Sequence, residues 1–115
     1  MQSMTTADLS KERDTSELQS EFEAAFEELF SASSEIDPFA LYTLKRLEIE
    51  SGLEIAKRIL LKTGQQTGLL RLWQQDRLDL SVEALALRPE FTTLFTSEEL
   101  EAARERLSDL DFSLD

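Results

Sequence analysis

Carboxylates at helical spacing are the side chains of this 115-residue chain that could do acid–base or metal chemistry. A helical di-iron site also needs Glu-x-x-His pairs, and the chain has no histidine. We interpret these acids as solvated helix faces and keep a carboxylate-only enzyme or accessory subunit as an alternative. The groups that would share one face of a helix are Glu17 with Glu21, Glu23 with Glu27, and Glu98 with Glu101 and Glu105.

Other catalytic and ligand-binding patterns are missing from the sequence. There is no cysteine, which excludes thiolate chemistry, disulfides and cysteine zinc sites. No Ser-x-x-Lys pair offers a serine nucleophile with a base, and residues 64–68 lack the Gly-Lys-Ser/Thr ending of a P-loop. We therefore predict no catalytic, metal-binding or cofactor-binding residue and no enzymatic activity. The lack of cysteine fits the reducing cytoplasm.

The net charge of -12 bounds the kind of partner. Nucleic acid and anionic membranes repel such a surface, so we expect no direct binding to either. No apolar stretch approaches the roughly 20 residues of a membrane span, and residues 1–15 lack the pattern of a signal peptide. The same charge permits an alternative function, an acidic nucleic-acid mimic that inhibits a DNA- or RNA-binding protein.

The charge is also uneven along the chain. Residues 1–35 carry nine acids and two bases, whereas residues 45–77 carry seven bases and four acids. Ordinary solvated helix faces explain this pattern. Alternatively, the basic middle of the chain docks the acidic N-terminal segment or a partner protein.

An acidic amphipathic helix is predicted over residues 15–31, where apolar side chains recur at helical period. Its apolar edge either packs on the protein's own core or binds a partner as a helix in a groove. A serine-rich linker over 31–34 would let this helix swing away from the rest. The candidate interaction residues of this edge are Phe22, Phe26, Leu29 and Phe30.

Cap signals and apolar spacing predict further helices. Capping boxes at Ser51-Gly-Leu-Glu54 and Thr96-Ser-Glu-Glu99 mark two helix starts, and Gly64 marks a stop. Apolar residues on two sides of the 38–50 helix predict a central, doubly buried position for it. The predicted helices cover 38–50, 51–62, 69–75, 81–88 and 97–110.

These segments predict the fold class and the domain organisation. No segment has the period-two pattern of a strand. We expect an all-α protein, a compact orthogonal bundle of six or seven mostly short helices, whose acidic amphipathic N-terminal helix either packs on the bundle or is detachable. Residues 15–34 form that helix and its linker, residues 35–110 form the helical domain, and residues 1–14 and 111–115 are disordered tails.

Trp73 lies between two arginines, Arg71 and Arg77, and the three are candidate interaction residues. Tryptophan and arginine dominate the hot spots of protein interfaces, so an exposed Trp73 would anchor a partner. Its helical spacing from Leu69 and Leu72 predicts instead that it faces inward with them, in a core or half-buried position.

About half of the chain, within residues 51–107, resembles a small helical module of uncharacterised bacterial proteins. The segments that carry the resemblance are 52–60, 70–73, 77–84 and 94–100. The resemblance implies a fold and no known activity. Together with the missing catalytic groups, it leads us to expect a non-enzymatic protein–protein interaction or regulatory module of the bacterial cytoplasm. Its partner would be another protein or a second copy of the chain itself.

Overall fold

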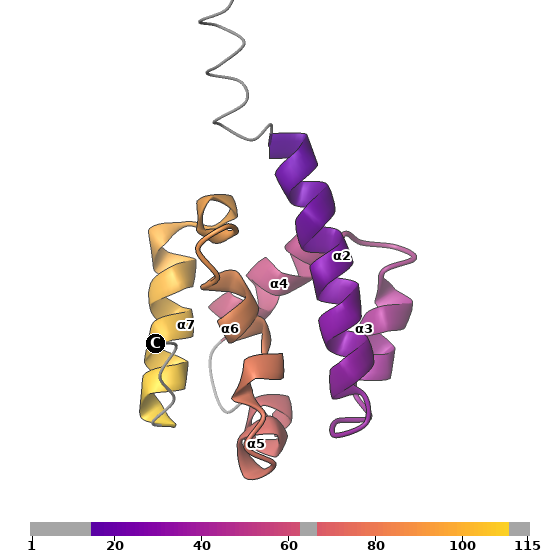
Figure 1. Ribbon diagram of the computed structural model, residues 1–115, viewed down its shortest axis with the longest axis vertical. Helices are drawn as coiled ribbons and strands as arrows, with labels where there is room; N and C mark the ends of the chain where they lie inside the picture. Colours follow the sequence, from indigo (N-terminus) through magenta and orange to yellow (C-terminus); the bar gives the residue numbers. More distant parts are fainter. Residues whose placement is uncertain (1–14, 63–66, 111–115) are drawn as a thin grey trace, which may run out of the picture.

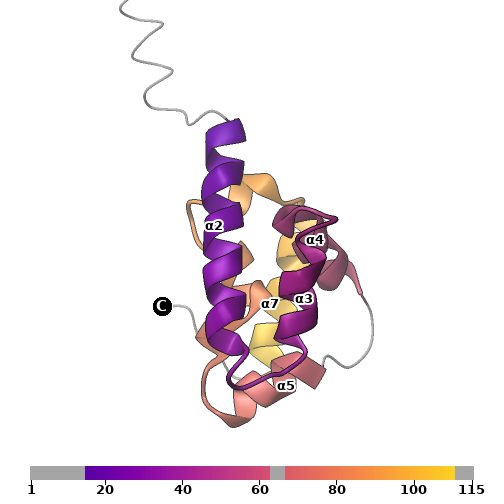
Figure 2. The same ribbon diagram turned by 90° about the vertical axis from the view of Figure 1, so that its right-hand side faces the viewer.

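The apolar periods of the sequence do form helices. A computed structural model describes residues 15–62 and 67–110, and these ranges contain six α-helices, two short 3-10 turns and no strand (Figures 1 and 2). This confirms the predicted all-α bundle. The predicted tails and the Gly64 stop lie outside the described residues. The elements are α2 (Thr15–Ser33), α3 (Ala40–Arg46), α4 (Gly52–Leu61), α5 (Thr67–Gln74), η1 (Leu78–Leu80), α6 (Val82–Ala86), η2 (Thr92–Leu94) and α7 (Ser97–Asp109).

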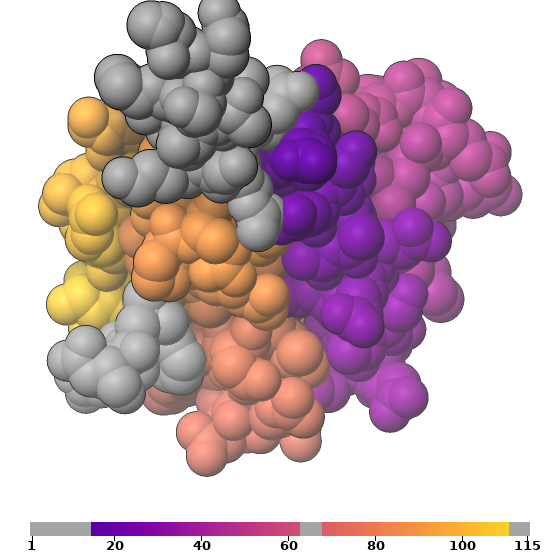
Figure 3. Space-filling model, turned by 45° about the horizontal axis from the view of Figure 1, so that its top comes forward, coloured from indigo at the N-terminus to yellow at the C-terminus, as the bar shows by residue number. Residues whose placement is uncertain are grey.

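Helix α2 is a core element and not a detachable arm. Leu18, Phe22, Phe26 and Leu29 are buried in the larger of two apolar clusters. The ring of Phe22 meets the ring of Phe91 edge-on, with 5.2 Å between the ring centroids. In the space-filling view, α2 lies between the α3–α4 side and the α6–α7 side of the molecule (Figure 3). Both sides of the bundle therefore pack on this helix.

The prediction of a flexible serine-rich linker over residues 31–34 is also wrong. Helix α2 runs through Ser33, which is buried, and its hydroxyl donates to the Phe30 carbonyl. The N–H groups of Ile36 and Asp37 both donate to the Ser33 carbonyl, which closes a tight turn. Because this serine hydroxyl is bonded to the preceding turn of the helix, the segment is not the flexible linker that its serine content predicts. The turn leaves no slack for α2 to swing out.

A carboxylate of α2 caps the start of α4. Glu23 accepts the N–H groups of Gly52 and Leu53 at 2.6 and 2.9 Å, and Ser51 accepts that of Glu54, as predicted. A Cβ atom at Gly52 would lie 2.9 Å from both the Glu23 carboxylate and the Phe26 ring. Glycine is therefore required here by the close approach of α2. The first turn of α4 depends on a helix far earlier in the chain.

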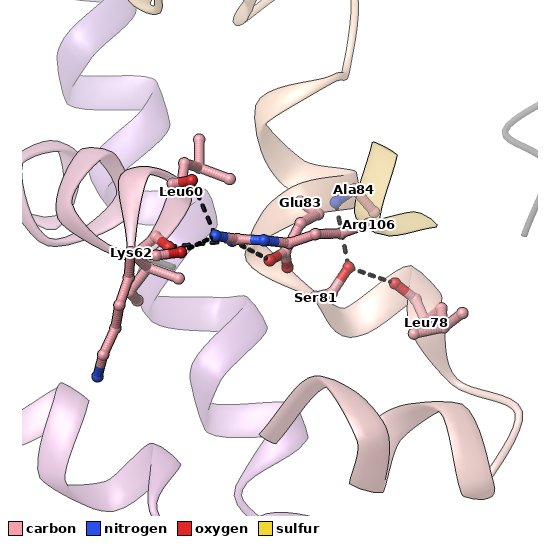
Figure 4. A network of polar contacts seen from close by, with 8 residues as sticks. Leu60, Lys62, Leu78, Ser81, Glu83, Ala84 and Arg106 are labelled. Atoms are coloured by element: carbon pink, nitrogen blue, oxygen red, sulfur yellow. Dashed lines mark hydrogen bonds and ion pairs between the residues drawn. The ribbon is translucent and has the colours of Figure 1, made fainter. Parts of the chain in front are cut away.

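The C-terminal end of α4 is held by Arg106 of α7 (Figure 4). Its guanidinium donates to the carbonyls of Ile59, Leu60 and Lys62 and to the buried carboxylate of Glu83 in α6. The last carbonyls of a helix have no hydrogen-bond donor within that helix. The Arg106 side chain provides the missing donors for α4. It joins α4, α6 and α7 at a single point.

The start of α7 is as the sequence predicts. The Thr96 hydroxyl accepts the N–H of Glu99, and the Glu99 carboxylate accepts the N–H of Thr96, which completes the capping box. Glu99 is buried and also binds Lys57 of α4 at 2.9 Å. The cap thus has a second role, because it ties α7 to α4.

Candidate protein interaction surface

Four of the six exposed large apolar side chains in the described residues lie on and around α3. Only Ala40 of this helix is buried, so the predicted central position is wrong. Helix α3 packs on α2 through one side, and its other side is left uncovered at the edge of the bundle (Figure 1). The exposed side chains are Phe39 (58% exposed), Leu41 (58%), Tyr42 (74%) and Ile49 (75%). We call these four residues, with Lys45 between them, the α3 face.

Local backbone bonds hold the α3 face together. The Asp37 carboxylate accepts the N–H of Phe39, and Pro38 starts the turn that leads into α3, close to its predicted place. Beyond Arg46 the chain keeps a helical course, since Ile49 N–H donates to the Arg46 carbonyl at 2.8 Å. Residues four apart share a helix side. Leu41 and Lys45 therefore share one side of α3, and the exposed Ile49 follows in the turn that continues from the helix.

Aromatic contacts extend this surface toward α5. The rings of Phe39 and Tyr42 stack with centroids 6.1 Å apart. The Arg71 guanidinium lies 5.7 Å from the Phe39 ring centroid, and its Nε lies 4.0 Å from the Asp37 carboxylate. A cation over an aromatic ring is attracted to it. Arg71, predicted as an interaction residue, therefore borders the α3 face.

The α3 face is cationic although the whole chain is acidic. Lys45 has no carboxylate partner among residues 15–62 and 67–110, whereas Arg46 and Arg58 share the single carboxylate of Glu50 at 2.6 Å each. With the acids Glu48 and Glu54, the surrounding area carries three positive and three negative charges, and the α3 face itself carries the single positive charge of Lys45. The charge of the α3 face is thus opposite in sign to the net charge of -12.

Two carboxylates that hold separate parts of the bundle, Glu50 beside the α3 face and Glu99 in α7, have pKa values below the ordinary value. Hydrogen bonds from Arg58 and then Arg46 lower the pKa of Glu50 to about 2. Burial on its own would raise the pKa of Glu99, but the hydrogen bonds from Lys57 and from the Thr96 backbone outweigh it, and the pKa lies below its usual value. Both carboxylates therefore favour the folded state only while they are charged.

We expect acid to weaken the fold through these two groups. A folded-state pKa below the unfolded value gives stability that is present above the unfolded pKa and is lost as pH falls. The loss should begin near the ordinary value of 4.5 and continue toward about pH 2. Urea unfolding measured across this range should show a falling midpoint, with a flatter pH profile in Glu99→Gln. An equally steep profile in that variant would contradict the assignment.

The structure separates the predicted interaction residues. Phe22, Phe26 and Leu29 are buried, and the half-buried Phe30 stacks on Phe26 with centroids 4.5 Å apart. These four residues form the protein's own core, the first of the two possibilities that their spacing allowed. The side chains of Phe22, Phe26 and Leu29 are covered by the rest of the bundle, so they are not presented to a partner in this fold.

The predicted tryptophan cluster is also divided. Trp73 is 47% exposed, so it lies outside the core but is about half-buried, which is the second of the two positions that its helical spacing predicts. The Arg77 guanidinium is bound by Asp79 through two hydrogen bonds of 3.0 Å. Of the three candidates, the described contacts connect only Arg71 with the α3 face.

Sequence reasoning missed Leu41, Tyr42 and Ile49 as surface residues. The signal was present, since residues 38–50 have large apolar side chains on nearly every side of a short helix. Such a helix is either buried on two sides or exposed on one. In a bundle of this size the second outcome leaves an apolar patch, which is typical of a binding surface.

The carboxylate alternative has a weaker basis in the geometry. Asp37 and Glu83 line one cavity, but Asp37 accepts the Phe39 N–H and Glu83 is paired with Arg106. In the described ranges, no three acidic side chains converge as metal ligands would, and no helix is long and apolar enough to cross a membrane. Comparison of the chain with protein-family models, curated proteins and solved structures gave no significant match to any of them.

Proposed function

We propose that this protein is a non-enzymatic interaction module of the bacterial cytoplasm that docks another protein on its α3 face. The observation that carries the proposal is the exposure of four large apolar side chains on this one face, from 58% to 75%. Monomeric proteins seldom leave such a group uncovered, and aromatic residues beside arginine are typical of interface hot spots.

The charge of the face indicates the chemistry of the partner. Lys45 lies within the α3 face without a carboxylate partner in the described chain, and Arg71 borders Phe39. A partner helix with apolar anchors and flanking carboxylates would satisfy both features. The face is also remote from the acids of α7, because α3 and α7 lie at opposite sides of the molecule (Figure 1). An acidic segment bound here would therefore meet little repulsion from α7.

Site-specific photo-crosslinking in living cells tests this function. A photoreactive phenylalanine analogue in place of Tyr42 should give one discrete adduct with another protein. The same analogue in place of Ser108, an exposed residue of α7, is the matched control and should give none. An adduct from position 108 alone would overturn the proposal and support the nucleic-acid mimic, whose acidic stripe would lie along α7.

Point variants should then weaken the identified complex without unfolding the module. Tyr42→Ala is expected to raise the Kd by about 30-fold, the effect of a hot-spot truncation of roughly 2 kcal/mol. Because Tyr42 is exposed, the free energy of unfolding should change by no more than about 0.5 kcal/mol. Isothermal titration calorimetry and urea unfolding measure the two quantities. An unchanged Kd would exclude the α3 face as the docking surface.

A further inference from the structure

A cavity of about 360 Å³ lies between the two apolar clusters of the core. The first cluster contributes Phe30, Ile59 and Val82 to its wall, and the second contributes Leu69, Leu72 and Leu80. Its rim reaches the surface, since the exposed residues Phe39 and Lys62 also line it. Its volume falls in the range of pockets that hold small molecules.

Most polar groups of this cavity are already used by the protein. The Glu83 carboxylate binds Arg106, and Asp37 accepts the N–H of Phe39. The Ser81 hydroxyl donates to the Leu78 carbonyl and accepts the Ala84 N–H (Figure 4). Asp37 also lies 4.0 Å from Arg71, so the charges of both lining carboxylates have cationic partners. Because eight of the fifteen lining residues are apolar, the body of a ligand that fills the cavity must be largely apolar.

Lys62 is the exception among the lining charges. Its backbone carbonyl accepts from Arg106, but its side chain points away from that network (Figure 4). Its ammonium has no carboxylate partner in the part of the chain that the structure describes. The unpaired charge at the cavity is therefore positive, and a ligand would match it with an anionic group.

We propose that this cavity binds a small amphiphile with an apolar body and a terminal carboxylate. The body lies between Phe30, Ile59 and Leu72, and the carboxylate pairs with the Lys62 ammonium at the rim. The lining residues come from α2, α3, α4, α5, η1 and α6 and from the segments that join them, so the ligand joins the two apolar clusters that the cavity separates. The site is independent of the docking function of the α3 face, whose residues other than Phe39 do not line the cavity.

Titration calorimetry of the full chain with linear carboxylates below their micelle concentrations tests this site. Hexanoate, octanoate and decanoate should bind with a Kd that falls about fourfold for each methylene buried, until the cavity is full. Octan-1-ol, which lacks the charge, should bind at least tenfold more weakly than octanoate. No saturable binding of any of these probes would overturn the proposal.

Three variants locate the binding. Lys62→Met keeps the apolar stem and should abolish the preference for octanoate over octanol. Thr43→Phe projects a ring from the cavity wall and should weaken both probes more than tenfold, with urea unfolding confirming that the variant folds. Lys45→Met removes a cation of the α3 face outside the cavity and should leave both Kd values unchanged. Octanoate binding that survives both of the first two variants would place the probe elsewhere and overturn the proposal.

Discussion

Replacing Arg106 with alanine is expected to cost about 3–5 kcal/mol of folding free energy, because the change leaves a buried carboxylate without its partner. The guanidinium donates to Glu83 at 2.9 Å, and the Glu83 side chain is almost fully buried. The change also removes the donors to three carbonyls at the end of α4. Domains of this size are stable by only about 5–15 kcal/mol, so much of the stability would be lost.

Urea unfolding followed by circular dichroism measures this loss. Arg104→Ala is the matched control, since Arg104 lies two residues earlier on the exposed side of α7, where its ion pair with Glu101 should contribute less than about 1 kcal/mol. Glu83→Gln in the Arg106→Ala background should recover part of the stability, because it removes the unpaired charge. Arg106→Lys should have a free energy of unfolding between those of Arg106→Ala and the native protein, because an ammonium cannot reproduce the planar set of donors of a guanidinium. Equal losses of folding free energy from Arg106→Ala and Arg104→Ala would contradict the role of Arg106 in joining α4, α6 and α7.

Phe22→Ala should be the most damaging change within α2, at about 3–5 kcal/mol. The ring is fully buried and meets Phe91 and Phe95 edge-on, at 5.2 and 5.5 Å between centroids. A methyl group in its place leaves a cavity that these rings cannot close without losing their own contacts. The result separates the two interpretations of α2, because a detachable docking helix would tolerate the change.

Trp73→Ala provides the comparison for Phe22→Ala. It removes a larger aromatic side chain, but one that is nearly half exposed, so we expect a loss below about 1 kcal/mol. Thermal and urea unfolding of the two variants should therefore differ widely. Similar midpoints for the two variants would show that α2 does not carry the core, and the fold described above would be wrong in that region.

Local signals in the sequence predicted the local structure well. The Thr96–Glu99 capping box, the Ser51 cap and the apolar stripe of α2 all depend on residues within a few positions of one another. Such patterns determine where a helix begins and which side is apolar. They do not determine what covers that side. The central position predicted for residues 38–50 was wrong for this reason.

Contacts between distant residues were beyond the reach of pattern reasoning. Arg106 looks like an ordinary solvated residue of an acidic helix, yet it binds carbonyls 44–47 residues earlier in the chain. Glu23 looks equally ordinary, and its role as a cap for α4 depends on the packing of two helices. The cavity likewise arises where clusters from separate helices fail to fill the space between them. Each of these features depends on three-dimensional proximity that a single sequence does not encode locally.

Because Glu23 of α2 caps the start of α4, the amides of Gly52 and Leu53 can report the separation of these two helices. The amide protons of Gly52 and Leu53 are bonded to a carboxylate 29 and 30 positions earlier, so they exchange with deuterated solvent freely only when α2 leaves its place. The exchange rates of these two amides would report the separation of α2 from α4. The exchange rates of amides within α2 report it less directly, because they also respond to fraying at the start of that helix. Hydrogen exchange at these two amides therefore measures how often α2 separates from the start of α4.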